Sequence, residues 1–182
     1  MLFSFKSFSQ RDKVLIKNDV YQIIYSEVLQ QPINVKYTVL CSDGTFSRKG
    51  MNFKKPEDII TSDNDDYKDN DYDKGHLAPA ADFNCDNNKL LETFSYLNCA
   101  LQNTYLNKGT WEFLENHERE LSKKYKVNVE VRLGFSKKSI KLKSGATVPD
   151  YFIKIIKYNK ITEKYYFKNE KPLYTDYTKY KI

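Results

Sequence analysis

One short stretch of the chain combines residue types that could move a proton. It reads Asp-Lys-Gly-His-Leu-Ala-Pro-Ala-Ala-Asp over residues 73–82, and His76 is one of two histidines in the 182 residues. Histidine is the side chain best suited to accept a proton near neutral pH. Gly75 permits a tight turn or a close backbone approach, and Pro79 fixes the path of the chain beyond it. His76 is therefore a candidate general base, although a lone histidine is more often structural or solvated.

A second group of polar residues follows downstream, between residues 98 and 115. It consists of Asn98, Gln102, Asn107, Trp111 and Glu115. Amide and carboxylate oxygens are ligands for hard divalent cations. This block makes a catalytic reading of His76 more plausible than its local context does.

Together the two stretches resemble the signature of the DNA/RNA non-specific endonucleases, the ββα-metal or His-Me finger nucleases. The first is similar to the family's Asp-Arg-Gly-His motif. The second is similar to its Asn…Gln…Asn…Trp…Leu-Glu pattern, in the same order and at the right distance. The resemblance runs from about Tyr21 to Tyr158. It includes Pro32–Leu40, which is similar to a Pro-x-x-Val-x-Tyr strand, and Val148–Lys154, which is similar to a Val-Pro-x-x-(aromatic)-x-Lys strand.

The resemblance implies a role for each polar residue of the pattern. His76 would be the general base that deprotonates water, and Asn107 would be the protein ligand of Mg²⁺ or Mn²⁺. Magnesium keeps several waters and accepts few protein oxygens, so one asparagine is reasonable. Glu115, two helical turns beyond Asn107 and within about 80° of its face, would hold a water of the metal. Asn98 would orient the histidine or the substrate, and Lys74 would contact phosphate.

Plainer interpretations exist for the same residues. Asn107 could cap a helix, and Glu115 could be an exposed helix carboxylate. Trp111 fits a core position, and His117 fits a solvated helix surface. Asp73 could orient a neighbouring group or simply occupy a turn.

The sequence departs from the family pattern at two positions. Lys74 stands where arginine is usual, which keeps the charge but loses bidentate phosphate binding. Leu101 stands where proline is usual, which affects local loop geometry more than chemistry. Near residues 47–53 the family often has an arginine that contacts phosphate. Arg48 is the candidate here, with a solvated surface arginine as the alternative.

The composition is compatible with a nucleic-acid partner but does not identify one. The net charge is +6 with a pI of about 9.0, and the chain contains 15 Tyr and 11 Phe. Neutralisation of phosphates drives non-specific binding to nucleic acids, and tyrosine can stack on bases. Biased composition alone could also produce the tyrosine excess. DNA and RNA are the expected partners, with a homodimer as a possibility.

The three cysteines leave the redox state open. Cys41, Cys85 and Cys99 form no Cys-x-x-Cys pair, which argues against a structural zinc site. We expect three free or partly buried thiols, with a Cys85–Cys99 pair as the alternative. The start of the chain, Met1–Phe8, is too short and interrupted for a signal peptide, and no apolar run approaches membrane-spanning length. The compartment stays unknown, with secretion or the periplasm expected if a signal has been removed.

The pattern along the chain predicts one domain over residues 1–182. Residues 1–19 form a lead-in, and residues 159–182 form a basic segment rich in Tyr and Lys, either a strand pair or a tail. Strands are expected at 20–25, 34–41, 127–135 and 151–158, a helical stretch at 87–94 and a helix at 103–124, which Thr104 or Asn107 could cap. An aspartate-rich loop at 56–73 lacks EF-hand spacing, so a mobile approach to the site is favoured over Ca²⁺ binding.

We therefore expect an α+β fold with a central antiparallel sheet flanked by helices and a ββα-metal finger that carries His76 and Asn107. The expected function is a metal-dependent, sugar-non-specific endonuclease for DNA and RNA. The main alternative is a catalytically weakened nuclease fold that binds nucleic acid without cleaving it. A protein-interaction module and a nuclease specialised for single strands or RNA are further alternatives.

Overall fold

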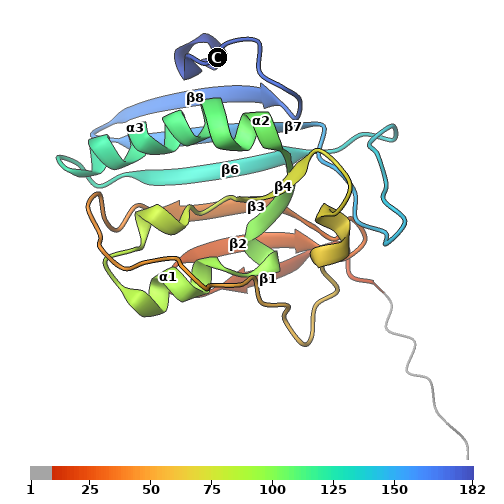
Figure 1. Cartoon of the computed structure of the whole chain (residues 1–182). Helices are drawn as coiled ribbons and strands as arrows, with labels where there is room; N and C mark the ends of the chain where they lie inside the picture. The colour runs from red at the N-terminus through yellow and green to blue at the C-terminus, as the bar shows by residue number, and fades with distance from the viewer. Residues whose placement is uncertain (1–9) are drawn as a thin grey trace, which may run out of the picture.

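Six antiparallel strands form the central sheet of the protein (Figure 1). The computed structural model describes residues 10–182, so residues 1–9 of the predicted lead-in lie outside it. In spatial order the strands are β1 (Val14–Lys17), β2 (Tyr21–Ser26), β3 (Gln31–Thr38), β6 (Asn128–Gly134), β7 (Tyr151–Tyr158) and β8 (Ile161–Lys168). Every neighbouring pair is antiparallel. The predicted fold class, an antiparallel sheet with helices, is confirmed.

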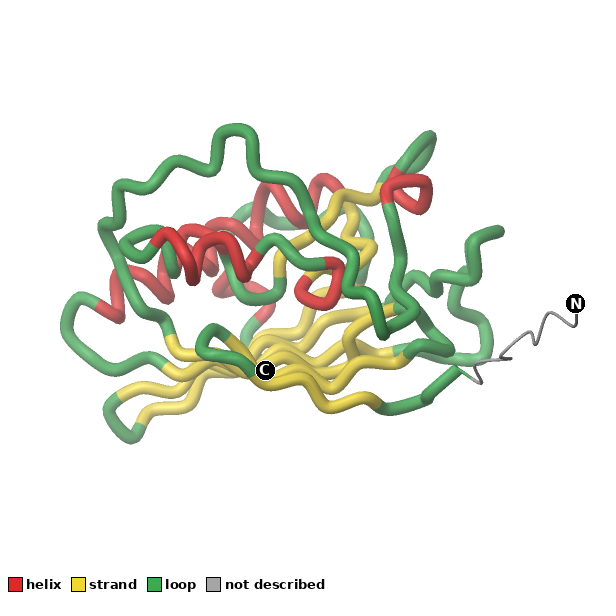
Figure 2. The backbone as a smooth tube through the Cα atoms, turned by 90° about the horizontal axis from the view of Figure 1, so that it is seen from below, coloured by secondary structure: helices red, strands yellow, loops and turns green. Residues whose placement is uncertain are grey.

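Alternation of side chains separates a buried face of the sheet from a solvent face. On β3, for example, Val35 and Tyr37 are buried, whereas Lys36 between them is exposed. Successive residues of a strand point to opposite faces, so this period of two sends apolar residues to one side. Within residues 10–182, the helices lie on that side and none covers the other face of the sheet (Figure 2). The core therefore lies between the helices and one face of the sheet.

A second, smaller sheet and the helices make up the covering layer. β4 (Tyr72–His76) pairs with β5 (Cys99–Asn103). The helices are α1 (Asn87–Thr93), α2 (Thr104–Leu106) and α3 (Glu112–Ser122), with a π-turn (Asn107–Trp111) between the last two. Single 3-10 turns occupy Asn64–Tyr67, Ala80–Asp82, Tyr96–Asn98 and Tyr177–Tyr180. β4, β5 and the α2–α3 segment form a ββα unit.

Several local predictions need correction. β1 lies within the predicted lead-in, and β5 was not predicted, because both strands are short. The helix predicted over 103–124 is interrupted at Gly109, which has non-helical backbone angles. Its cap is Asn103, whose side chain accepts from the N–H groups of Tyr105 and Leu106, rather than Thr104 or Asn107. The C-terminal segment is neither a strand pair nor a free tail, since β8 is followed by an irregular stretch that packs on the protein.

That irregular stretch docks through aromatic and ionic contacts. Tyr177 stacks on His117 with ring centroids 5.3 Å apart, and Lys181 pairs with Glu163 at 3.1 Å. His117 also contacts Glu163 at 2.9 Å. The expectation that His117 is simply solvated is therefore wrong, because the C-terminal segment partly covers it.

The cysteines differ from expectation. Cys41 and Cys85 form a disulfide, and Cys99 is a buried free thiol on β5. Backbone hydrogen bonds hold the two bonded segments together: the Cys41 N–H donates to the Asp82 carbonyl at 3.0 Å, and the Phe46 N–H to the Asn84 carbonyl at 2.9 Å. Two segments 44 residues apart in sequence thus meet through tertiary packing, so sequence spacing could not identify the pair.

The aspartate-rich loop contains a hydrogen-bonded turn. Asp63 and Asp66 form a reciprocal capping box around the turn at Asn64–Tyr67. Within residues 10–182, no group of three or more His, Cys, Asp or Glu side chains is arranged to hold a metal ion. Across the same residues no helix has the length and apolar character needed to cross a membrane.

Candidate active site

A cleft of about 310 Å³ lies over the ββα unit, lined by residues of β4, the π-turn and α3. Five residues singled out from the sequence contribute to its lining: Arg48, Lys74, His76, Asn107 and Glu115. The rest of the lining consists of Pro79, Ala80, Ala81, Lys108, Glu112 and Arg119. Segments far apart in sequence thus meet at one surface.

The pairing of β4 with β5 positions His76. His76 is the last residue of β4 and lies opposite Cys99 of β5. One residue earlier, a Cβ on Gly75 would collide with the side chain of Gln102. The glycine of the first motif and the glutamine of the second are therefore complementary, since only glycine leaves room for that side chain.

The imidazole of His76 sits between two aromatic rings. Its centroid lies 4.8 Å from that of Phe53 and 4.9 Å from that of Phe94, which meets it edge-on. Burial, together with the positive charge of Arg48, lowers the pKa of His76 to about 3. Among the described residues, no group bonds to its buried Nε2 atom. His76 is therefore a neutral imidazole at physiological pH, which is the form that can accept a proton.

Asn107 is held by a carboxylate from the neighbouring strand. Its Nδ2 donates to Asp73 Oδ2 at 3.0 Å, and Lys108 Nζ lies 3.1 Å from the same oxygen. Thr104 also donates to Asp73 through its hydroxyl. The Oδ1 atom of Asn107 accepts no hydrogen bond from the described part of the chain. Asp73 thus fixes the orientation of the Asn107 amide, and the Oδ1 atom of this amide remains able to bind a ligand.

Asn107 also stands at a break in the helix. It is the first residue of the π-turn that separates α2 from α3. Turns of this kind are often found at functional sites. The regular-helix argument that placed Glu115 near Asn107 does not hold across the break, although both residues line the cleft.

Glu115 belongs to a buried cluster of charges beneath the cleft. Lys154 Nζ pairs with Glu118 at 2.6 Å, and Arg119 pairs with Asp82 at 2.7 Å. Burial and the charge of Glu118 raise the pKa of Glu115 to about 7, against the opposing effects of Lys154 and Arg119. Three carboxyl groups therefore share two cations, an imbalance that an added cation would relieve.

Lys74 is enclosed rather than extended into solvent. Its Nζ atom lies 5.5 to 5.6 Å from the ring centroids of Phe53, Tyr67 and Tyr96, and it donates to Asn64 Oδ1. Aromatic faces attract an ammonium group electrostatically. Arg48, by contrast, is exposed at the rim. The two side chains therefore differ in mobility. Lys74 is held among three aromatic rings, a cage formed by Phe53, Tyr67 and Tyr96, whereas exposed Arg48 can move to contact a ligand.

Asn98 lies outside the cleft. It is fully buried, accepts from the Ala78 N–H at 2.9 Å, and donates to the Ala78 and Thr93 carbonyls. These bonds occupy both ends of its amide. The observed geometry gives Asn98 the role of holding the chain just after His76 rather than a contact with the cleft.

Sequence reasoning missed several residues of the site. Arg119 and Glu112 line the cleft, and Phe53 packs on the histidine. Arg119 could have been found, since it follows Glu115 by four residues and so shares its helix face. No feature of the sequence linked Phe53 to the site, because its loop lies more than 20 residues before His76.

Comparisons with known proteins agree with this geometry. A family model described as DNA/RNA non-specific endonuclease matches residues 2–181. The chain is 36% identical over 86 residues to the mitochondrial nuclease EXOG of Danio rerio, covering 45% of this chain and 25% of that protein. It is 28% identical over 129 residues to human mitochondrial endonuclease G, covering 62% and 43%.

A solved structure shares the fold. The crystal structure of the EndoG/EndoGI complex contains a chain that superposes with a TM-score of 0.82 at 24% identity, covering 92% of this chain and 79% of that one. The curated relatives are longer, and the chain spans less than half of their length.

Proposed function

The chain belongs to the DNA/RNA non-specific endonuclease family, and from this we propose that it is a divalent-metal-dependent endonuclease that hydrolyses phosphodiester bonds of DNA and RNA. The observation that carries the proposal is the cleft itself. It combines a neutral histidine, an oriented asparagine oxygen and a carboxyl group with a raised pKa. Cations at its rim suit a phosphate substrate.

His76 is proposed to take a proton from the attacking water. Its low pKa keeps it unprotonated, but it also makes the imidazole a weak base. Part of that lowering comes from Arg48. A substrate phosphate paired with Arg48 would offset this charge and raise the pKa of His76 toward the working range. Arg48 thus couples substrate binding to the strength of the base.

The residues present fit a divalent cation. Asn107 offers an oxygen held in place by Asp73, and the excess of buried carboxyl groups near Glu115 favours a positive charge. A hard oxygen ligand of this kind suits Mg²⁺, with Mn²⁺ as the alternative. When bound, the cation would supply Lewis acidity to the phosphate and the leaving oxygen. Glu115 would act from the same cleft as an acceptor for water, becoming ionised as a cation lowers its pKa.

Lys74 and Arg48 are proposed to contact backbone phosphates. Contacts to the backbone carry no sequence information, so weak sequence preference and activity on both sugar types are expected. Asn98 is proposed only to position the chain that follows His76.

The test is incubation of the purified chain with supercoiled plasmid and with a folded RNA, in Mg²⁺, in Mn²⁺ and in chelator. Degradation of both substrates in a divalent metal but not in chelator is expected. Absence of cleavage in every metal would contradict the proposal.

Lys74 stands where the family usually has arginine, and this favours one alternative to an active nuclease. In this alternative the protein has a nuclease fold that binds nucleic acid but cleaves it weakly. In that case the chain would show salt-sensitive binding with little turnover. The variant Lys74→Arg restores the bidentate donor. A large gain in cleavage by this variant would support the alternative, and an unchanged rate would argue against it.

A further inference from the structure

A row of residues crosses the whole solvent face of the sheet, on the side away from the cleft. Strand register aligns its members, one from each strand. In order from β1 to β8 they are Lys17, Gln22, Lys36, Glu130, Ile155 and Lys164. Lys157 lies two residues beyond Ile155 on β7 and points to the same face.

The four lysines of this face, called here the lysine row (Lys17, Lys36, Lys157 and Lys164), are exposed and have no ion-pair partner within 4.0 Å in residues 10–182. Of the six aligned residues only Glu130 is acidic. It is already engaged, since it accepts from Arg132 and from Asn34, each at 2.8 Å. The face therefore carries positive charge that the protein itself does not neutralise.

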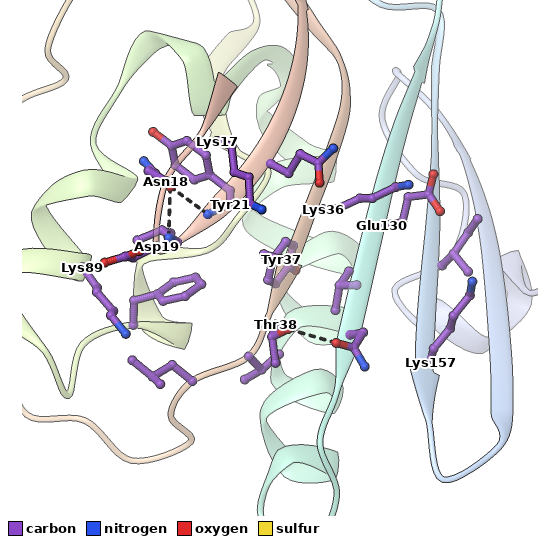
Figure 3. Close-up of a pocket in the computed structure, with 18 residues that line it drawn as sticks. Lys17, Asn18, Asp19, Tyr21, Lys36, Tyr37, Thr38, Lys89, Glu130 and Lys157 are labelled. Carbon is purple, nitrogen blue, oxygen red and sulfur yellow. Dashed lines mark hydrogen bonds between the residues drawn. The ribbon is translucent and has the colours of Figure 1, made fainter. Parts of the chain in front are cut away.

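The lysine row borders an open groove of about 460 Å³ (Figure 3). Lys17, Lys36 and Lys157 line it, and the groove also reaches α1 on the helical side, whose Lys89 adds a fourth positive charge. The acidic residues of the lining are Asp19 and Glu130. Four cations against two carboxylates make the groove suited to an anionic ligand.

We propose that the lysine row binds the phosphate backbone of nucleic acid, as a second binding face separate from the catalytic cleft. The proposal rests on the proposed nuclease function. Neighbouring strands lie about 4.8 Å apart, so Lys17 and Lys36 are separated by about 10 Å, and Lys36 and Lys164 by about 14 Å. In duplex DNA each strand carries one phosphate per 3.4 Å or so along the axis. A duplex therefore presents several phosphates over the length of the row.

A second copy of this chain fits the face less well. Two copies related by a two-fold axis would place the same patch against itself. Lysines would then meet lysines, with one carboxylate per copy that is already bonded to Arg132. Like charges at an interface are repulsive, whereas a polyanion is complementary to every lysine of the row.

The position of the row predicts how it acts. Because the sheet separates it from the cleft, the row cannot contact the few nucleotides being cut. A duplex is stiff over about 150 base pairs, so a short duplex lies along one face at a time, whereas a long one can reach both. The lysine row therefore holds long substrates near the enzyme without altering the chemical step.

The experiment compares two triple variants with equal loss of charge. Lys17→Gln/Lys36→Gln/Lys157→Gln removes three cations from the face. The matched control, Lys137→Gln/Lys138→Gln/Lys143→Gln, removes three exposed lysines from the segment between β6 and β7. Binding to a plasmid-length duplex is measured in chelator over a range of salt. Cleavage of a short duplex of about one helical turn, roughly 10 base pairs, is measured in Mg²⁺.

We expect the row variant to lose about tenfold or more in affinity for the long duplex at low salt. Its slope of log K against log salt should fall by about three, roughly one per lysine removed. Cleavage of the short duplex should stay within about twofold, and the control should keep both properties. Circular dichroism melting of both variants checks the fold.

Three outcomes would overturn the inference while leaving the nuclease function intact. The first is an equal loss of DNA affinity in the row variant and in the control. The second is that the row variant loses affinity for phosphatidylserine vesicles but not for DNA. The third is a change in its sedimentation which shows that the row joins two copies of the chain. Failure of the unmodified chain to bind or cleave any nucleic acid would instead refute the proposed function itself.

Discussion

Lys154 and Lys157 lie three residues apart on β7, yet they occupy opposite environments. Lys154 is fully buried, pairs with Glu118 and lies 4.4 Å from the centroid of the Trp111 ring. Lys157 is exposed on the lysine row and has no ion-pair partner in the described chain. The same residue type thus serves two purposes on one strand.

The comparison extends to the two sides of the sheet. On the helical side, charged groups lie close together, most of them buried, and they shift the pKa of their neighbours, as at Glu115 and His76. On the solvent side, the lysines of the row are exposed and have no ion-pair partner among the described residues. Buried charges provide fixed geometry and tuned acidity, which chemistry requires. Exposed charges provide attraction that salt can screen, which binding of a polyanion requires.

The largest expected effect comes from removing the proposed base. The variant His76→Ala should lower the cleavage rate by about 10²- to 10⁴-fold, because general base catalysis typically contributes this much. Affinity for a long duplex in chelator should stay within about twofold, since the lysine row is intact. Retained cleavage would remove His76 from the mechanism, and an equal loss of binding would break the division between the two faces.

The two lysines of β7 test the comparison through stability. Lys154→Met should destabilise the fold by about 3 to 5 kcal/mol, because it leaves Glu118 buried without its cation. Lys157→Gln should change stability by no more than about 0.5 kcal/mol, as exposed substitutions usually do. Urea denaturation of both variants provides the measurement. Similar stability of the two variants would show that the buried ion pair is not structurally important.

A smaller effect is expected from the residue that orients Asn107. The variant Asp73→Ala removes the acceptor of the Asn107 amide, so metal-dependent activity should fall by about 10- to 100-fold. The loss should be partly recovered at high Mg²⁺ if the defect lies in holding the cation. Asp71→Ala, an exposed aspartate two residues earlier, is the control. A Mg²⁺ titration indistinguishable from that of the unmodified chain would contradict the role of Asp73.

A further expected effect concerns pH. In metal-free protein His76 should stay neutral down to about pH 4, because burial and Arg48 lower its pKa to about 3. In the unfolded chain its pKa is about 6.5, so the unfolded state binds the extra proton first. The stability contribution of this residue therefore declines as pH falls from about 6.5 to 3.

Two measurements check this prediction. Imidazole resonances followed by NMR should show one histidine, absent in His76→Ala, that does not titrate between pH 8 and about 4. The unmodified chain should also lose more stability on acidification than His76→Ala does. Titration of His76 near its ordinary pKa of about 6.5 would show that its ring is solvated.

Much of the fold could be predicted from local patterns. The bounds predicted for the strand at 151–158 match those of β7, and the helical stretch predicted at 87–94 contains α1, whose cap, Asp86, was not predicted. The motif around His76 and the downstream polar block indicated the family and the ββα unit. These signals lie within a few residues of one another, where strand period, capping and turn chemistry operate.

Contacts between distant segments depended on packing alone. The Cys41–Cys85 disulfide, the Asp73–Asn107 bond and the cage of Lys74 each join segments that no local rule pairs. The alignment of Lys17 with Lys36 and Lys164 depended likewise on strand order and register. Sequence therefore determined which chemical groups the protein possesses. Only the tertiary structure decided which groups are buried together in a cleft and which are left unpaired in water, because burial and pairing follow from the packing of the whole chain.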